Sequence, residues 1–248
     1  MKIACSSSTF AGAIARGERT QLEWLDACAN ELEVDGVVFA REHFPRTDAE
    51  YLAQLKKTAT DLGLTIAAVA DDGVWHDAAS FDIASSLGAP LIVARPARAT
   101  DDARAWPDFV EAATEATRRA KSANITIALR NAPATLCEST ADLRRLAKDV
   151  DAAWLRYALD PTSLPPTDDP IPLLAKTVIA IHPITAPDTF ATPTDLEAPG
   201  LIARLARLRC FITLETQLRT SVATYNEALL RFQSLRHETL NNANETPA

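Results

Sequence analysis

Four ionisable residues in the second half of the chain each stand at the end of an apolar run: Arg130, Asp160, His182 and Glu215. A carboxylate or an imidazole can move protons or bind a divalent cation, and a guanidinium can hold an anionic oxygen. Burying an unpaired charge is costly, so these side chains are poor candidates for a hydrophobic core. Their types indicate acid–base or ligand-binding chemistry, provided that the fold brings them together.

Four further polar residues adjoin apolar runs, and we expect them to contact a substrate: Asn131, His43, Asp71 and Arg95. Three of them also have an ordinary structural explanation. His43 can be a loop histidine without a function. Asp71, beside Asp72, can cap a helix or form a turn. Arg95 can be a solvated arginine in place of a phosphate contact.

The apolar runs recur along the whole chain, with helical patterns between them. Most are continuously apolar, as at Leu91–Ala94, which indicates strands that are buried on both faces of a parallel sheet. The eight predicted strands are Lys2–Ser6, Gly36–Ala40, Leu64–Ala70, Pro90–Arg95, Ile125–Arg130, Leu155–Asp160, Val178–His182 and Cys210–Glu215.

Capping residues and apolar stripes mark the helices between these strands. Thr20 and Glu23 form a capping-box pattern, and Gly63 is a typical helix stop. The predicted helices are Gln21–Glu33, Asp48–Gly63, Trp106–Ala120, Ser139–Val150, Asp195–Leu208 and Ser221–Leu235. The polar, aperiodic segment Asn241–Ala248 is predicted to be a disordered tail.

Repeated strand–helix units without a composition break predict an α/β fold, a single (β/α)8 TIM barrel over residues 1–240. The alternative is an open doubly wound sheet, which usually shows a glycine-rich first turn when it binds nucleotides. Gly12 and Gly17 have phosphate-loop spacing, but Glu18 would repel a phosphate. In a barrel, reactive side chains lie at the carboxyl ends of the strands, so the first four residues should converge there.

The composition and net charge argue against some classes of binding partner. The chain has 248 residues, with 25 Lys and Arg against 33 Asp and Glu, a net charge of −8. This charge argues against nucleic acid and against an anionic membrane surface. The longest apolar run, Leu64–Ala70, is too short to span a bilayer. Four scattered cysteines predict buried thiols in a reducing cytoplasm. The oligomeric state stays open, and a homo-oligomer is one alternative.

Short motifs at the strand ends make the chain resemble a known family. They are Leu159-Asp160-Pro161, Ile181-His182, Thr213-Leu214-Glu215 and the run Ser86-Leu87-Gly88-Ala89. With these motifs, nearly the whole chain is similar to the xylose isomerase-like barrels, which include sugar isomerases, epimerases and some abasic-site endonucleases. The resemblance implies one divalent ion held by Glu, Asp, His and Glu from strands five to eight. It also implies that the two glutamates move a proton beside a sugar carbonyl.

The chain departs from this family pattern at its first metal ligand. Arg130 stands before Asn131, where the family has the glutamate of strand five. Ser163 and Thr185 also replace residues that are often His and Asp in the family. A guanidinium neither binds a cation nor loses its proton at working pH. We therefore predict that the family's divalent metal is absent or weakly bound.

Exchanging a glutamate and a metal ion for an arginine conserves the net charge of the cavity, −1 in both cases. Arg130 could fork between Asp160 and Glu215. The first hypothesis is a sugar or sugar-phosphate isomerase or epimerase-like protein that acts on a small polyhydroxy carbonyl compound. Its base would be Glu215, oriented by His182, with Arg130 in place of the metal.

The alternative is a non-catalytic barrel that binds a sugar-like ligand or a partner, with the charged residues forming only an internal salt-bridge cluster. Nuclease action at abasic DNA would need several metals and a basic face. Four histidines and a net charge of −8 make that third hypothesis a poor fit.

Overall fold

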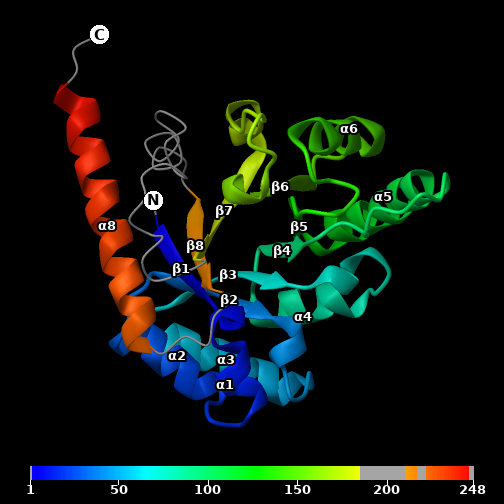
Figure 1. Ribbon diagram of the computed structural model, residues 1–248. Coiled ribbons are helices and arrows are strands. Elements are labelled where there is room, and N and C mark those ends of the chain that lie inside the picture. Colours follow the sequence, from blue (N-terminus) through cyan, green and yellow to red (C-terminus); the bar gives the residue numbers. More distant parts are fainter. Residues whose placement is uncertain (1, 185–209, 217–221, 246–248) are drawn as a thin grey trace.

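The structure is a computed structural model that describes residues 2–184, 210–216 and 222–245. Eight parallel strands form a closed barrel in sequence order (Figure 1). The strands are β1 (Lys2–Ser6), β2 (Gly36–Ala40), β3 (Thr65–Ala70), β4 (Leu91–Ala94), β5 (Thr126–Arg130), β6 (Leu155–Leu159), β7 (Thr177–Ile184) and β8 (Phe211–Thr216). The predicted single (β/α)8 barrel is confirmed.

Closure depends on the pairing of the first and last strands. The backbone of β1 pairs in parallel with that of β8, with Lys2 opposite Phe211 and Cys5 opposite Leu214. This pairing leaves no open sheet edge, whereas a doubly wound sheet would keep these two strands apart. The alternative fold is thereby excluded.

Helices surround the barrel (Figure 1). They are α1 (Ala11–Ala15), α2 (Gln21–Asn30), α3 (Ala49–Asp61), α4 (Ala79–Leu87), α5 (Ala105–Ala123), α6 (Thr140–Val150) and α8 (Val222–Glu245). Short 3-10 turns follow several strands, among them η1 (Ser7–Phe10), η2 (Arg41–His43), η3 (Asp72–Trp75) and η4 (Pro161–Ser163). None of the helices in the described ranges is long and apolar enough to cross a membrane.

Local signals account for the helix starts. The side chain of Thr20 accepts a hydrogen bond from the backbone of Glu23, whose carboxylate accepts one from the backbone of Thr20 in return. Asp48 caps α3, and Ser139 forms a second capping box with Asp142. Each contact satisfies backbone N–H groups that the first helical turn leaves unpaired.

The structure adds to the predicted helices in three places, the first of which is the short helix α1. α4 was not among them, although Gly88 ends it in a left-handed conformation, a common helix stop. α8 continues to Glu245, past the predicted end at Leu235, because no glycine or proline interrupts the chain before Pro247. The predicted tail from Asn241 is thus helical as far as Glu245. The predicted helix Asp195–Leu208 lies outside the described residues.

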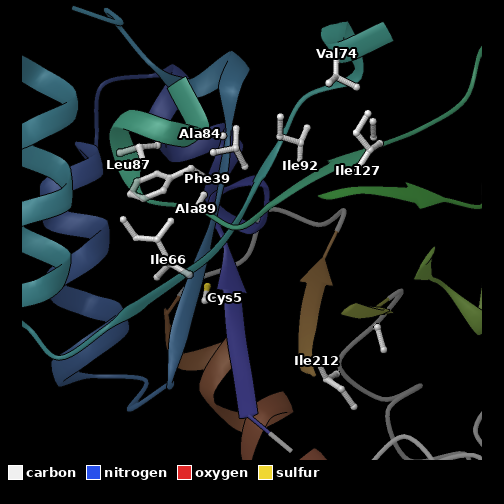
Figure 2. Close-up of a cluster of buried hydrophobic side chains, with 14 of the residues drawn as sticks. Cys5, Phe39, Ile66, Val74, Ala84, Leu87, Ala89, Ile92, Ile127 and Ile212 are labelled. Atoms are coloured by element: carbon white, nitrogen blue, oxygen red, sulfur yellow. The ribbon is translucent and has the colours of Figure 1, made fainter. Parts of the chain in front are cut away.

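Two hydrophobic cores flank the strands. The outer core lies between strands and helices, and Figure 2 shows part of it, with Phe39 from β2, Ile66 from β3 and Leu87 from α4. The inner core fills the barrel and consists mainly of small residues: Ala4, Val38, Ala67, Ala68, Val93, Ala128, Ala158, Ile179 and Ile181. Neighbouring residues on a strand alternate between these cores, which explains the continuously apolar runs.

Candidate active site

Successive side chains of a strand point to opposite faces of the sheet. This alternation directs three of the four ionisable residues into the barrel: Arg130, Asp160 and Glu215. On β5, Ile127 and Leu129 belong to the outer core and Ala128 to the inner one, so Arg130 follows Ala128 on the inner face. Asp160 likewise follows two residues after the inward-facing Ala158 and faces inward. On β8, the outward-facing residues are Ile212 and Leu214, so Thr213 and Glu215 face inward. The carboxyl ends of β5, β6 and β8 thus build one site.

The guanidinium of Arg130 bridges two carboxylates from different strands. Its Nη1 donates to Oε2 of Glu215 at 2.7 Å, and its Nη2 donates to Oδ2 of Asp160 at 3.2 Å. The exposed side-chain fractions are 20% for Arg130, 17% for Glu215 and 0% for Asp160. Burial disfavours the charged form of Arg130, but attraction to Glu215 and Asp160 outweighs it and raises the pKa of Arg130. The cation is therefore permanent.

Both the carboxylate and the backbone of Asp160 form several hydrogen bonds. Its Oδ2 also accepts a hydrogen bond from the hydroxyl of Ser163 at 2.8 Å, and its Oδ1 accepts from the hydroxyl of Thr162 at 2.8 Å and from the backbone of Ser163 at 3.2 Å. Asn131 braces the backbone of Asp160, because its amide oxygen accepts from the N–H and its amide nitrogen donates to the carbonyl. These contacts give Asp160 a fixed position and leave its carboxylate with little capacity for a ligand.

A cavity of about 860 Å³ opens above these residues at the carboxyl ends of the strands. Seven charged residues line it, three arginines and four carboxylates: Arg41, Arg95, Arg130, Glu42, Asp71, Asp72 and Glu215. Its deeper wall is apolar and includes Val38, Val93, Ile179 and Ile181 of the inner core. Within the described lining, the charged groups thus gather at the rim while the floor is hydrophobic.

Opposite Arg130, the rim is built around Arg41, which was not among the predicted site residues. Its Nη1 donates to Oδ2 of Asp71 at 2.8 Å, and its Nη2 donates to Oδ2 of Asp77 at 2.7 Å. The hydroxyl of Ser80 donates to the same oxygen of Asp71. These carboxylates raise the pKa of Arg41. The available signal was the one used for Arg130, a charged residue directly after an apolar strand.

Of the other residues that were predicted to contact a substrate, some line the cavity and some do not. Asp71 and Arg95 line the cavity, and Arg95 forms an ion pair with Asp72 at 2.7 Å. Asn131 is fully buried as the brace described above, and it is not among the residues that line the cavity. Its predicted contact with a substrate stays a prediction.

His43 is also absent from the cavity lining. Its ring is almost completely buried, and Nδ1 lies 3.0 Å from the hydroxyl of Ser7. That hydroxyl accepts a hydrogen bond from the backbone of Ala40. Burial lowers the pKa of His43, only partly opposed by Glu42. His43 thus links the ends of β1 and β2, and its predicted role in substrate binding stays untested.

The side chain of His182 lies outside the described residues, so its convergence with Asp160 and Glu215 stays a prediction. The backbone register is described: Ile181 pairs with Thr213, His182 pairs with Leu214, and Glu215 pairs with Pro183. His182 is therefore one register position away from Glu215.

The residues present do not fit the divalent metal that the resemblance implies. Arg130 occupies the space between Asp160 and Glu215, and the remaining acceptor sites of Asp160 are used by Thr162 and Ser163. Over the described ranges, no group of three His, Cys, Asp or Glu side chains is arranged to hold a metal ion. A cation here would lie against a permanent positive charge.

Solved structures share this architecture at low sequence identity. The D-psicose 3-epimerase of Clostridium cellulolyticum has a TM-score of 0.73 at 13% identity, covering 97% of this chain and 99% of its own. A probable 3-DHS dehydratase, AsbF, from Bacillus anthracis has a TM-score of 0.73 at 14% identity, covering 95% and 98%. An AP endonuclease, family 2, from Brucella melitensis has a TM-score of 0.70 at 16% identity, covering 94% and 99%. These likenesses show the fold alone.

No curated protein sequence matches the chain. A family model described as xylose isomerase-like TIM barrel matches residues 26–176, which is more than half of the chain. The matched part runs from within α2 to the residue before β7 and includes both Arg130 and Asp160. The chain belongs to the xylose isomerase-like TIM barrel family.

Proposed function

We propose that this protein is an isomerase or epimerase-like enzyme for a small polyhydroxy carbonyl compound, in which Arg130 replaces the metal-ligand glutamate of its family. The observation that carries this proposal is the Arg130–Glu215 contact at the cavity wall. A guanidinium has five N–H donors, and the described residues use two of those of Arg130. Three donors remain for oxygen atoms of a ligand.

Glu215 is the base in this proposal. Within the described part of the chain, its Oε2 accepts from Arg130, whereas Oε1 has no hydrogen-bond partner. A carbonyl oxygen bound to Arg130 would place the adjacent carbon near this carboxylate. Glu215 would take the carbon-bound proton, and the N–H groups of Arg130 would stabilise the negative oxygen of the enediolate.

The same carboxylate would return the proton to the neighbouring carbon, while a hydroxyl proton moves between the two oxygens through solvent. This sequence interconverts an aldose and a ketose without net change of atoms. Inversion of a carbon centre would need a second acid on the opposite face. Besides Glu215, the carboxylates that line the cavity are Glu42, Asp71 and Asp72, and a second acid would have to come from among them.

The charges support a neutral substrate over a phosphorylated one. The described cavity has one more carboxylate than arginine, and Asp160 adds a further negative charge directly behind Arg130. Each arginine of the lining already contacts at least one carboxylate. A phosphate would therefore meet few unneutralised cations.

The second candidate is a barrel that binds its ligand without turnover. It is favoured by one observation: the ion pairs of Arg130 and the four hydrogen bonds of the Asp160 carboxylate are complete without a ligand. Charged residues that only stabilise the barrel mouth would form these contacts without acting on a substrate.

Hydrogen exchange separates the two candidates. EDTA-treated protein is incubated with five- and six-carbon aldoses and ketoses in D2O, and ¹H NMR follows the C–H signals beside the carbonyl. The enzyme proposal predicts loss of one such signal and formation of the isomer. Glu215→Gln should abolish exchange, and Arg130→Lys should reduce it strongly. Arg118→Gln, which removes an exposed ion pair on α5, is the matched control.

Binding of a sugar without exchange would support the non-catalytic candidate. Exchange that survives Glu215→Gln would show that another group is the base. Exchange that requires added Mn²⁺ in the wild-type protein would contradict the replacement of the metal by Arg130.

A further inference from the structure

We propose that the hydroxyl of Thr213 is a floor contact of the ligand site and selects a compound with a hydroxyl group at its buried end. This inference deepens the proposed function and rests on it. Thr213 lies on β8 two residues before Glu215, and both side chains line the same cavity.

The hydroxyl of Thr213 is buried without a partner. The residue is 1% exposed, and among the described residues nothing forms a hydrogen bond to its Oγ1. Native proteins rarely leave a buried hydroxyl unpaired, because it loses its hydrogen bonds to water on folding. A valine has almost the same shape and would remove this cost. The unpaired group therefore points to a ligand.

Its surroundings make this hydroxyl selective. The neighbouring wall of the cavity comes from Val38, Val93, Ile179 and Ile181, which offer no side-chain hydrogen bonds. Among the described residues of this wall, Thr213 is the one with a polar side-chain atom, so a ligand group that reached its Oγ1 would otherwise meet hydrocarbon. A site of this kind accepts one hydroxyl in one place and penalises an analogue that lacks it.

The distance between Thr213 and Glu215 along β8 gives the expected size of the ligand. Residues two apart on a strand are separated by roughly 6.6 to 6.8 Å, so a compound of a few carbons reaches from Glu215 to Thr213. A threonine hydroxyl both donates and accepts hydrogen bonds, and so does a primary alcohol. The expected arrangement has the carbonyl at Arg130 and a terminal CH2OH group on the floor, with its methylene against Ile179 and Ile181.

The first test needs no ligand. Urea unfolding is compared for the wild-type protein, Thr213→Val and Thr213→Ser. If the hydroxyl of Thr213 serves to bind a ligand, Thr213→Val should have a raised urea midpoint, because its methyl group avoids the cost of burying an unpaired hydroxyl. Thr213→Ser keeps the hydroxyl, loses a methyl group and should have a lowered midpoint. A lowered midpoint for Thr213→Val would overturn the inference, since the hydroxyl would then have a structural role.

The second test measures selectivity with D-xylulose, 1-deoxy-D-xylulose and 5-deoxy-D-xylulose by calorimetry. The wild-type protein and Thr213→Ser should prefer D-xylulose over one of the deoxy compounds by at least about tenfold. Thr213→Val should lose that preference. A preference that persists in Thr213→Val would overturn the inference. If the wild-type protein binds no ketose, the proposed function fails, while a raised midpoint for Thr213→Val still supports a hydroxyl reserved for a ligand.

Discussion

Replacement of Arg130 by glutamate should give the barrel mouth a measurable affinity for Mn²⁺. The substitution removes the cation between Asp160 and Glu215 and adds a third carboxylate at the position where the resemblance implies a metal ligand. Oxygen donors of this type suit Mn²⁺ and similar ions. The wild-type protein should bind the ion weakly.

The expected size of the effect follows from Coulomb's law. Two unit charges about 4 Å apart interact by about 4 kcal/mol at an effective dielectric constant near 20, so a divalent ion beside Arg130 is repelled by about 8 kcal/mol. This corresponds to about six orders of magnitude in affinity. Movement of the guanidinium toward solvent reduces the penalty, so we expect the variant to bind at least about a hundredfold more tightly.

Calorimetry with Mn²⁺ measures this difference, and circular dichroism shows whether each variant is folded. Arg130→Gln is the matched control, because it removes the charge without adding a carboxylate, and it should gain only part of the affinity. Without metal, Arg130→Glu should be destabilised by about 3 to 5 kcal/mol, because the buried carboxylates lose their partner. Mn²⁺ should then raise its Tm. Equal affinity of wild type and Arg130→Glu, or of the Glu and Gln variants, would refute the reasoning.

Three further outcomes can be measured on the same protein. Asn131→Ala removes both hydrogen bonds to the backbone of Asp160 and should cost about 2 to 4 kcal/mol in urea unfolding. Asn30→Ala loses only an exposed side-chain contact and should cost less than about 0.5 kcal/mol, so similar losses would contradict the bracing role. Burial lowers the pKa of His43 below 6.5, so the unfolded chain binds the proton more readily and stability should decline as pH falls from 6.5 through the lowered folded pKa. His43→Gln should reduce this dependence of stability on pH relative to wild type. An unchanged pH profile would show that other groups cause the decline in stability. Burial raises the pKa of the Cys137 thiol to about 12, so Ellman's reagent at pH 8 should fail to modify Cys137 before urea unfolds the chain, and rapid labelling of Cys137 in the folded protein would contradict its burial.

Much of the fold could be predicted because its signals are local. Each strand is a short apolar run that is buried on both faces, and the capping boxes at Thr20 and Ser139 lie within four residues of chain. The order of strands around a barrel then equals their order in the sequence. The position of Arg130 at the end of β5 followed from the same count, and so did its two expected carboxylate neighbours, which the structure brings into contact.

The roles of Arg41, Asn131 and His43 depend on partners that are distant in the sequence. Arg41 contacts Asp71 and Asp77, which are 30 and 36 residues away. His43 contacts Ser7 across 36 residues. A residue type indicates which bonds a side chain can form, but it does not indicate which partner lies within reach. For this reason the sequence alone did not indicate the hydrogen bonds that Asn131 and His43 form within the protein, and their contacts with a substrate stay a prediction.

The register of β7 shows most clearly what only the tertiary structure decides. Between the pairs Tyr157–Thr177 and Ala158–Ile179, the strand contains one extra residue, Val178. Such a bulge shifts every later residue of β7 by one position against β6, so Ala180 lies opposite Leu159. On its other side β7 pairs regularly with β8, with Ile181 opposite Thr213 and His182 opposite Leu214. Counting from the end of an apolar run placed His182 level with Glu215, since such a count assumes that neighbouring runs end at the same height, whereas Glu215 is paired with Pro183. The sequence by itself determined which residues form the strands and which charges end them. The pairing of strands across the barrel decided which of those charges face one another.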